Sequence, residues 1–316
     1  MLIVFDGSYM LHRSCHLPNF EMLQTTSGFR TGGAYGTVKA IQSILHTFHA
    51  SRSVVVWDDV KRSERRMRIF PDYKGNRKLT PGTHDYEERQ QKSNFYKHQR
   101  SITERLLGFL GVSQITLPCC EADDVVGVMV RSYKDKCVVV TADKDYFQLV
   151  SENVSIWNPH KQVHTTPENF QEVAGVRQGH FLLAKAILGD TSDNIPGVNG
   201  IGEKTLVEMM KLIEKSDPID GDHGDLLGEL AIQVHREGTN RQKKLLEQVE
   251  VAHRNLELMD LSKEDFGYAE RCQILSSIFV SPLFQERTIL DEFRTLQFTE
   301  FMRDFVSFSA PFRVLQ

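Results

Sequence analysis

Leu2-Ile3-Val4-Phe5-Asp6-Gly7 begins with four apolar residues that end at a carboxylate, and the chain repeats this pattern twice. The three runs and their carboxylates are 2–5 with Asp6, 54–57 with Asp58, and 138–140 with Asp143. Short, continuous runs rich in β-branched residues are typical of strands buried on both faces, as in a parallel sheet covered by helices. Because parallel strands end at the same edge of a sheet, the pattern predicts three aspartates that face one crevice.

Helical patterns lie between these runs, over residues 36–49, 85–110 and 122–133, and a short strand is expected at 114–117. Strands that alternate with helices predict an α/β fold, with a mostly parallel central sheet flanked by helices.

After Trp157 the sequence contains no further convincing strand. Three helices are expected there, over residues 178–188, 203–214 and 226–235. We therefore expect a domain boundary near residues 175–178.

The chain has 316 residues, of which 40% are hydrophobic and 25% charged, as in an ordinary globular protein of about two domains or one large one. No apolar run reaches the ~18 residues of a membrane-spanning helix, and the N-terminus lacks the basic segment of a signal peptide. Five cysteines without CxxC spacing favour reduced thiols over disulfides or a zinc site. We therefore expect a cytoplasmic protein, in the host cytoplasm if it is viral, that makes no membrane contact.

The formal net charge of −4 argues against a nucleic-acid-binding protein, but the basic residues are unevenly distributed. Between Lys61 and Lys78 there are eight Lys and Arg residues and only two acidic residues. Such a run is often a solvated charged surface, and it is also found in basic grooves that bind phosphates. Both interpretations stay open from the charge alone.

Carboxylates are the main chemical feature of the chain, because it lacks a GxxxxGK[ST] loop, an HExxH pair, a GxSxG elbow and a kinase signature. Nine of them follow predicted strands or flank predicted helices: Asp6, Asp58, Glu121, Asp123, Asp124, Asp143, Asp145, Asp190 and Asp193. One carboxylate would complement a helix dipole, whereas so many repel one another unless cations neutralise them. Oxygen ligands in this number favour Mg²⁺ or Mn²⁺. Two such ions ~3.5–4 Å apart are the usual arrangement for attack of water on a phosphodiester.

A glycine-rich stretch, Ile195-Pro196-Gly197-Val198-Asn199-Gly200-Ile201-Gly202-Glu203-Lys204-Thr205, follows the last of these acids. Its glycines permit a tight turn whose backbone N–H groups approach a phosphate at the start of a helix. A dinucleotide-binding fingerprint has similar spacing, but it needs a preceding strand and a later acidic residue, and neither is predicted here. A helix–hairpin–helix that binds the backbone of duplex DNA fits better.

The last hundred residues contain two further features. Residues 217–225 are acidic and rich in turn formers, and we interpret them as a solvated linker because they do not match a calcium loop. From Phe266 onward there are eight more phenylalanines, at 279, 284, 293, 298, 301, 305, 308 and 312. So many aromatic residues are incompatible with a free tail, so this segment is expected to pack on the core or on a partner.

Together these stretches resemble the 5′-nuclease family, which includes flap endonucleases, phage 5′→3′ exonucleases and RNase H, and the N-terminal nuclease domain of bacterial DNA polymerase I. The matching stretches are Phe5-Asp6-Gly7 with Arg13, Gly33-Ala34-Tyr35-Gly36, Val56-Trp57-Asp58, Pro71-Asp72-Tyr73-Lys74-Gly75-Asn76-Arg77, Glu121-Ala122-Asp123-Asp124, 141–149 and 189–198. They occur in the family's order over residues 1–215 with every family carboxylate present, whereas residues 216–316 match only loosely.

The resemblance implies site residues and cofactors. Asp6, Asp58, Glu121, Asp123, Asp124 and Asp143 resemble the ligands of the catalytic metal pair, and Asp145, Asp190 and Asp193 resemble a second cluster. Two or more Mg²⁺ ions are expected, with Mn²⁺ as a substitute. Lys74 and Arg66 resemble the basic residues that steer the scissile phosphate at the base of the family's helical arch, here about residues 61–105. DNA contacts are expected from Arg13, Tyr73, Arg77, Lys78, Gly197, Gly200, Gly202, Lys204 and Thr205, and hairpin carbonyls are expected to hold K⁺.

The function implied is that of a structure-specific 5′→3′ exonuclease or flap endonuclease, which hydrolyses phosphodiesters near 5′ ends and removes RNA primers or flaps during replication. The expected partners are DNA with a 5′ flap, nick or 5′ end, RNA·DNA hybrids, and replication proteins such as a single-strand-binding protein or a polymerase. A monomer with three parts is expected: a nuclease core over 1–176, a helix–three-turn–helix region that binds duplex over 177–260, and a helical Phe-rich segment over 261–316.

Two other functions remain open. A PIN-type ribonuclease shares the acidic α/β core, but the duplex-binding hairpin and the arch argue against it. A non-catalytic protein that binds DNA structures would not need the full carboxylate set, and a cleavage assay on a flap substrate with and without Mg²⁺ distinguishes it.

Overall fold

The computed structural model describes residues 1–77, 84–216, 223–263 and 266–315. Lys78, residues 79–83 of the expected arch and residues 217–222 of the expected linker lie outside the described residues. Within the described ranges, no helix has the length and apolar character needed to cross a bilayer.

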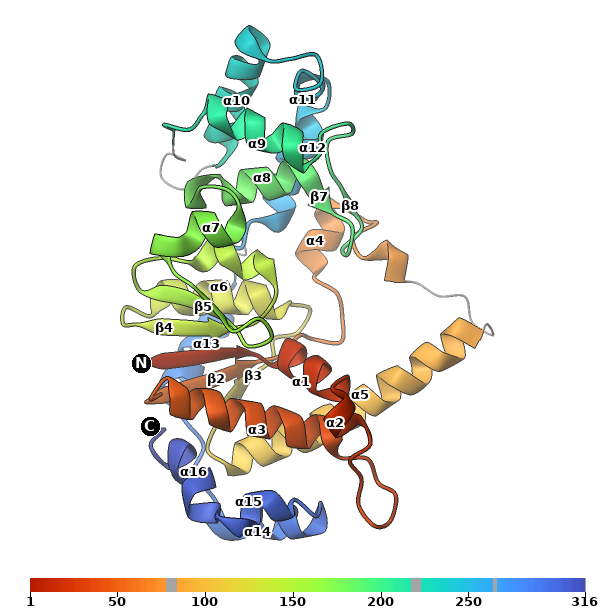
Figure 1. The fold of residues 1–316 in the computed structure, drawn as a ribbon, viewed down its shortest axis with the longest axis vertical. Coiled ribbons are helices and arrows are strands. Elements are labelled where there is room, and N and C mark those ends of the chain that lie inside the picture. The colour runs from red at the N-terminus through yellow and green to blue at the C-terminus, as the bar shows by residue number, and fades with distance from the viewer. Residues whose placement is uncertain (78–83, 217–222, 264–265, 316) are drawn as a thin grey trace.

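A six-stranded sheet forms the centre of the molecule (Figure 1). In spatial order its strands are β3 (Ser113–Ile115), β2 (Arg52–Val56), β1 (Leu2–Asp6), β4 (Cys137–Val140), β5 (Val154–Asn158) and β6 (Val163–Thr165). The first five are parallel, and β6 is antiparallel to β5. The predicted α/β fold is therefore confirmed. The three apolar runs are the adjacent strands β2, β1 and β4, so their aspartates follow one edge of the sheet.

The expectation of no strand after Trp157 is wrong. Residues Val163–Thr165 form β6, and the two-residue strands β7 (Gly189–Asp190) and β8 (Ile195–Pro196) pair with each other. An edge strand needs no continuous apolar run because part of it faces solvent, and these strands are too short to show a period. The β7–β8 pair closes the loop that carries two of the predicted carboxylates.

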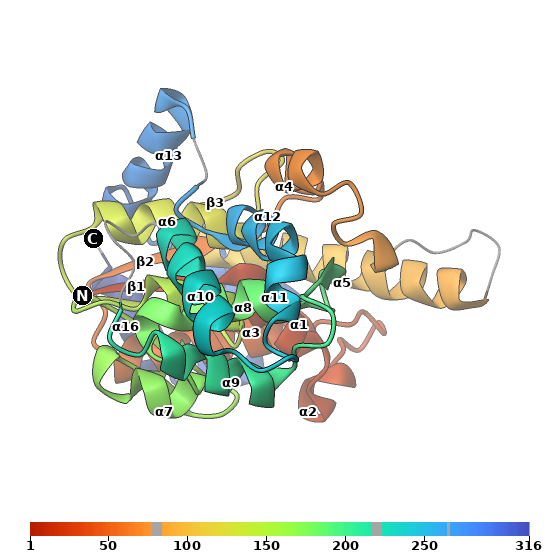
Figure 2. The same cartoon turned by 90° about the horizontal axis from the view of Figure 1, so that it is seen from above.

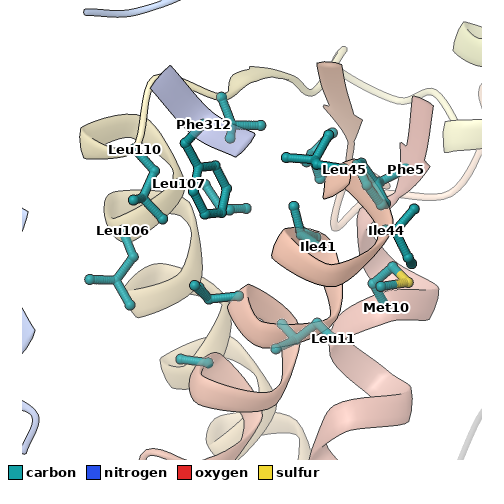
Figure 3. Close-up of a cluster of buried hydrophobic side chains, with 14 of the residues drawn as sticks. Phe5, Met10, Leu11, Ile41, Ile44, Leu45, Leu106, Leu107, Leu110 and Phe312 are labelled. Atoms are coloured by element: carbon teal, nitrogen blue, oxygen red, sulfur yellow. The ribbon is translucent and has the colours of Figure 1, made fainter. Parts of the chain in front are cut away.

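One face of the sheet is covered by α1 (Gly7–Cys15), α3 (Gly32–Thr47) and α5 (His84–Phe109), and α2 (Pro18–Glu21) contacts α3. The C-terminal helices α14 (Glu286–Thr295), α15 (Thr299–Arg303) and α16 (Phe305–Arg313) pack beside them (Figure 1). Figure 3 shows Leu45 of α3, Leu107 of α5 and Phe312 of α16 in the buried cluster that results.

The other face is covered by α6 (Ala122–Ser132), α7 (Phe170–Ala174) and α13 (Tyr268–Phe279). β1 contributes Ile3 and Phe5 to the first cluster and Leu2 and Val4 to this one, because successive side chains of a strand point to opposite faces. This double burial is the physical reason for the continuous apolar run that predicts the strand.

A third buried cluster belongs to the helices beyond the sheet (Figure 1). These are α8 (Phe181–Leu188), α9 (Glu203–Leu212), α10 (His223–Glu237), α11 (Lys244–Glu247) and α12 (Val249–Met259), with α4 (Glu64–Ile69) against α12. Short 3₁₀ helices occupy Gly75–Arg77 (η1), Lys144–Leu149 (η2), Pro167–Asn169 (η3) and Gln178–His180 (η4). Figure 2 shows helices α8 to α12 from above, with the N-terminal part of α5 projecting beyond them.

Helix α3 begins at Gly32, four residues before the predicted start. A Cβ on Gly32 would lie 1.7 Å from the carbonyl oxygen of Phe20, and one on Gly33 would lie 2.6 Å from Cys15 Sγ. Glycine lowers helix propensity, so the pattern hides this first turn, although the close packing there requires glycine.

Most of the C-terminal phenylalanines pack on the core, which is one of the two expected alternatives, whereas Phe279 is 55% exposed. Phe293, Phe298, Phe301, Phe308 and Phe312 are buried in the first cluster. The C-terminal segment covers both faces of the sheet, because α14, α15 and α16 contribute to the first cluster and α13 contributes to the second.

Two contacts attach this segment to α3. The Tyr35 and Phe301 rings stack with centroids 4.5 Å apart, and Lys39 Nζ lies 2.7 Å from Glu300 Oε1.

Candidate active site

A cavity of about 230 Å³ lies at the carboxyl ends of β1, β2 and β4, and we call it the acidic cavity. It brings together eight of the nine predicted carboxylates with two cations. Its lining consists of Asp6, Asp58, Glu121, Asp123, Asp143, Asp145, Asp190, Asp193, Lys74, Arg77, Tyr146 and Ser192. Described residues from six separate stretches of the chain therefore converge on one small volume.

Asp6 and Asp58 are fixed by the starts of two helices. Asp6 caps α1 by accepting from the backbone N–H of Tyr9 at 2.9 Å, and its second oxygen accepts from Thr141 Oγ1 at 2.9 Å. Asp58 accepts from the backbone N–H of Ala122 at 2.8 Å, at the first residue of α6. Burial, and then repulsion from Asp58, raises the pKa of Asp6 to about 8.

Asp143 and Asp145 lie on the first turn after β4, and Asp143 Oδ1 accepts from the backbone N–H of Asp145 at 2.8 Å. Burial raises the pKa of Asp143 to about 6, although Lys185 opposes the rise. Lys185 of α8 forms an ion pair with Asp145 and lies 3.2 Å from Asp190 Oδ2. The sequence analysis missed Lys185, although a single lysine within the apolar helix 181–188 is a signal that a charge partner is near.

Arg66 and Asp124 lie beside the acidic cavity and not in its lining. The buried Arg66 guanidinium is 2.8 Å from Glu121 Oε2, 3.0 Å from Asp123 Oδ2 and 2.8 Å from Asp124 Oδ1. Burial alone would lower the pKa of Arg66, but these three carboxylates raise it well above its usual value. Burial would likewise raise the pKa of Asp123, yet Arg66 and Lys74 hold it below its usual value.

The structure thus places Arg66 and Asp124 against each other beside the acidic cavity, whereas a cation aimed at the scissile phosphate and a ligand that faces the ions would line it, and both roles stay predictions. The physical reason is tertiary: α4 packs on α12, and Arg66 Nε donates to the carbonyl oxygen of Leu258 at 3.4 Å. This packing directs the guanidinium into the carboxylates behind the cavity wall.

Of the two described cations of the basic stretch that line the acidic cavity, Arg77 and Lys74, the more buried is Lys74. Its Nζ lies 2.6 Å from Glu121 Oε2 and 3.6 Å from Asp193 Oδ2. The buried hydroxyl of Tyr73 is 2.9 Å from the same Glu121 oxygen and 3.1 Å from Asp193 Oδ2. Burial raises the pKa of Tyr73, so its hydroxyl keeps its proton. Arg77, about half exposed, donates to Asp193 Oδ1 at 2.7 Å.

The glycine-rich hairpin follows directly from the loop of Asp190 and Asp193. Gly197 is required by close packing, since a Cβ there would lie 2.1 Å from the carbonyl oxygen of Leu188. Gly200 has a φ of +86°, in the left-handed region that favours glycine. Gly202 precedes the first residue of α9, and Lys204 lies exposed on the first turn of that helix. The N–H groups at this helix start are thus placed to meet an anion.

Two side chains near this hairpin were missed by the sequence analysis. The Lys244 side chain crosses the turn, so that a Cβ on Gly200 would lie 2.9 Å from Lys244 Nζ. Gln248 accepts from the backbone N–H of Asn199 at 2.9 Å and donates to its carbonyl oxygen at 3.2 Å. Both residues are about 45 positions away in sequence, so no local pattern connects them to the turn.

Arg13 and Thr205 are the remaining residues for which the sequence predicts a contact with DNA. Arg13 lies in the last turn of α1, outside the lining of the acidic cavity, and its Nε is buried without a hydrogen-bond partner among the described residues. Thr205 lies on α9, half-buried.

The donor set fits hard cations. In the described ranges, no group of three or more His, Cys, Asp or Glu side chains is already arranged to hold an ion. However, Asp6 and Asp143 both have raised pKa values because carboxylates are buried close together. Divalent cations would relieve this repulsion, and carboxylate oxygens are the ligands that Mg²⁺ and Mn²⁺ prefer.

Known proteins with similar sequences include exonucleases and DNA polymerases. Residues 1–175 match the family model described as 5′-3′ exonuclease, N-terminal resolvase-like domain. The chain is 32% identical over 213 residues to a 5′-3′ exonuclease of Buchnera aphidicola subsp. Schizaphis graminum, which covers 66% of this chain and 69% of that protein. It is 30% identical over 240 residues to DNA polymerase I of Mycobacterium bovis, covering 72% of this chain and only 25% of the polymerase.

Solved structures share the fold. The D15 flap endonuclease of bacteriophage T5, in a pseudo-enzyme–product complex with DNA and metal ions, aligns with a TM-score of 0.66 at 22% identity. That alignment covers 94% of this chain and 99% of the other. The catalytic core of Rad2 in complex with DNA substrate aligns with a TM-score of 0.57 at 12% identity, covering 93% and 86%.

An α/β sheet with an acidic cavity at its carboxyl edge, followed by a glycine-rich hairpin, defines the class of protein as a nuclease. The chain belongs to the 5′-3′ exonuclease family, which confirms the resemblance carried by its sequence motifs.

Proposed function

We propose that this protein is a structure-specific 5′ nuclease that hydrolyses phosphodiesters near 5′ ends in flap, nicked or RNA-primed DNA, and that it removes primers or flaps during replication. The observation that carries the proposal is the acidic cavity, where eight carboxylates and Lys74 converge beside a hairpin suited to phosphate. The flap endonuclease of T5 and the exonuclease relatives support the same reaction.

The acidic cavity would hold two or more Mg²⁺ ions, with Mn²⁺ as a substitute. Asp6, Asp58, Glu121, Asp123 and Asp143 would serve as ligands on one side of the cavity, and Asp145, Asp190 and Asp193 on the other. When bound, such ions activate a water molecule as a Lewis acid does and stabilise the departing oxygen. Asp124 would act indirectly, by holding Arg66 against the ligand Asp123.

Lys74 would bind a non-bridging oxygen of the scissile phosphate. Its ammonium already lines the acidic cavity, and its bond to Glu121 fixes the direction in which it points. A cation placed where negative charge develops stabilises the transition state more than the ground state. Tyr73, whose ring lies 4.9 Å from Lys74 Nζ, keeps the ammonium on one side of the cavity.

Duplex DNA would bind at the hairpin through Gly197, Gly200, Gly202, Lys204 and Thr205, with Lys244 as an additional cation. Arg13, Tyr73, Arg77 and Lys78 would guide the strand that enters the acidic cavity. A K⁺ ion held by hairpin carbonyls remains part of the proposal, because a carbonyl that accepts one hydrogen bond keeps a second lone pair.

The three expected parts would divide this work, with cleavage in 1–176, duplex binding in 177–260 and support of the core by 261–316. We further propose that the protein acts as a monomer and meets a single-strand-binding protein or a polymerase at its substrate.

The test compares cleavage of matched 5′-flap, nicked, gapped and RNA·DNA substrates, each with Mg²⁺ and with EDTA, using Asp143→Asn as the inactive control. We expect Mg²⁺-dependent cleavage near the 5′ end. Tight flap binding without cleavage would instead identify a protein that only binds DNA structures. Cleavage confined to single-stranded RNA would identify a PIN-type ribonuclease.

A further inference from the structure

The backbone of Lys74 has an unusual conformation. Its φ is +53°, in the left-handed region that lysine rarely adopts. The backbone N–H of Gly75 donates to the carbonyl oxygen of Asp72 at 2.8 Å, which makes residues 72–75 a turn with Lys74 in its third position. With a positive φ that position normally holds glycine or asparagine. A strained conformation of this kind persists only where surrounding contacts hold it.

Two contacts from the loop between β7 and β8 hold the backbone of this turn. The backbone N–H of Lys74 donates to the carbonyl oxygen of Asp193 at 2.8 Å. Asn194 Nδ2 donates to the carbonyl oxygen of Asp72 at 2.8 Å, the same oxygen that closes the turn. The side chain of Asn194 therefore binds the carbonyl oxygen that closes the turn in which Lys74 has its positive φ.

Asn194 is itself suited to this position. Its φ is +60°, which asparagine tolerates better than other residues with a side chain. The turn then directs the Lys74 side chain into the acidic cavity, where Nζ meets Glu121 Oε2 at 2.6 Å. Two left-handed residues from distant parts of the chain thus support each other next to the proposed catalytic cation.

We propose that Asn194 is a positioning residue: its amide holds the turn that aims the Lys74 ammonium at the scissile phosphate. This proposal rests on the proposed role of Lys74 in cleavage. Asn194 touches neither the substrate nor the ions in this scheme, and it acts only through the backbone of residues 72–75.

The experiment is a double-mutant cycle with Asn194→Gly and Lys74→Ala, read out as the single-turnover cleavage rate and Kd on one flap substrate with Mg²⁺. Glycine removes the amide but keeps the left-handed backbone, so backbone strain at position 194 does not confuse the result. We expect Asn194→Gly to slow cleavage about tenfold or more, as small misplacements of catalytic groups do, with little change in Kd. In the Lys74→Ala background the same change should have almost no further effect.

Asn153→Ala is the matched control. Asn153 Nδ2 also donates to a backbone carbonyl, that of Lys134 at 3.0 Å, in a loop away from the acidic cavity. The Asn153→Ala variant should cleave at the wild-type rate. If Asn194→Gly does not fold, as judged by its melting curve, Asn194→Asp replaces it, because aspartate also tolerates the left-handed region but cannot donate.

A wild-type rate for a folded Asn194 variant, or an equal loss in both backgrounds, would overturn the positioning role while leaving the proposed function of Lys74 intact. A wild-type rate for Lys74→Ala alone would overturn the role of Lys74 and the positioning role with it.

Discussion

Asp123 and Asp124 are neighbours in sequence, yet only Asp123 lines the acidic cavity. Successive residues of a helix are rotated by roughly 100° about its axis, so α6 directs the two side chains differently. Asp124 is fully buried and lies 2.8 Å from Arg66 Nη2. Breaking a buried ion pair by removing one partner costs about 3–5 kcal/mol, because the remaining charge loses its compensation.

This difference predicts opposite effects on stability for two conservative changes. Asp143→Asn removes a charge from a crowded cavity, so it should abolish cleavage, retain DNA binding and leave the metal-free melting temperature unchanged or raised. Asp124→Asn should lower the melting temperature, because Arg66 loses a buried partner. Thermal unfolding without divalent ions, together with a gel-shift assay, checks both. Near-normal turnover by Asp143→Asn would contradict the proposed ligand set.

Lys74→Ala should slow single-turnover cleavage about a hundredfold or more, because a cation that stabilises charge in the transition state commonly contributes that much. Its Kd for a flap substrate should change only modestly. The measurement is the rate at saturating protein, with Kd determined separately. A variant that loses affinity and keeps its rate would show that Lys74 anchors the DNA backbone instead.

The hairpin depends on an element that its own sequence does not reveal. α11 and the start of α12 lie against the turn, where Lys244 crosses Gly200 and Gln248 makes two hydrogen bonds with Asn199. Asn255 of α12 also donates to the carbonyl oxygen of Pro196 at 2.9 Å. These contacts tie the turn to α11 and α12, and in the proposed function they would set its N–H groups before DNA binds.

Gly200→Val should weaken duplex binding severalfold or more, since a β-branched residue is strained at a φ of +86° and its Cβ would lie 2.8 Å from Lys244 Cδ. Binding to single strands should change little. Gly228→Ala is the control, because a Cβ on Gly228 of α10 meets no atom within 4 Å. Equal losses on duplex and single strands would mean that the turn has only a structural role.

Lys244→Ala should weaken binding of duplex DNA and reduce the salt dependence of log Kd by about one unit, as expected for the loss of one phosphate contact. The cleavage rate at saturating protein should stay near that of the wild type. A Kd series over salt concentration tests this, and an unchanged slope would remove Lys244 from the interface.

At the scale of the whole molecule, the acidic cavity collects charges from strands, helices and loops that meet only after folding. Among the described residues, carboxylates outnumber the cations that reach them, since Lys74, Arg77, Lys185 and Arg66 stand against the eight acids of the lining. The fold thus keeps like charges close together, at a cost in stability that bound cations would offset.

Mg²⁺ should therefore raise the melting temperature, because a ligand that binds only the folded state stabilises it, by about 2.7 kcal/mol at a concentration 100 times its Kd. The same ionic strength supplied as NaCl should have a much smaller effect. Asp143→Asn should reduce the Mg²⁺-dependent shift. Identical melting curves with and without Mg²⁺ would contradict binding of ions in the acidic cavity.

Much of the site was predictable because its signals are local. The apolar runs that end at Asp6, Asp58 and Asp143 reflect strands buried on both faces, and such burial needs apolar residues at every position. Gly200 of the hairpin likewise reports the backbone conformation at its own position. Edge strand β6 and the first turn of α3 escaped prediction because one is too short and polar and the other too rich in glycine.

The sequence by itself determined the parallel sheet, the edge where its aspartates gather and the glycine-rich turn after them, because each depends on residues close together in the chain. Only the tertiary structure decided which of two cations, Arg66 or Lys74, lines the acidic cavity. Arg66 and Lys74 lie eight positions apart in one basic stretch, and both look equally suited to bind a phosphate. The packing of α4 on α12 buries the first against three carboxylates, whereas the loop of Asn194 turns the second into the cavity. Such partners are far apart in sequence, so their contacts are set by how the elements pack and not by any local pattern.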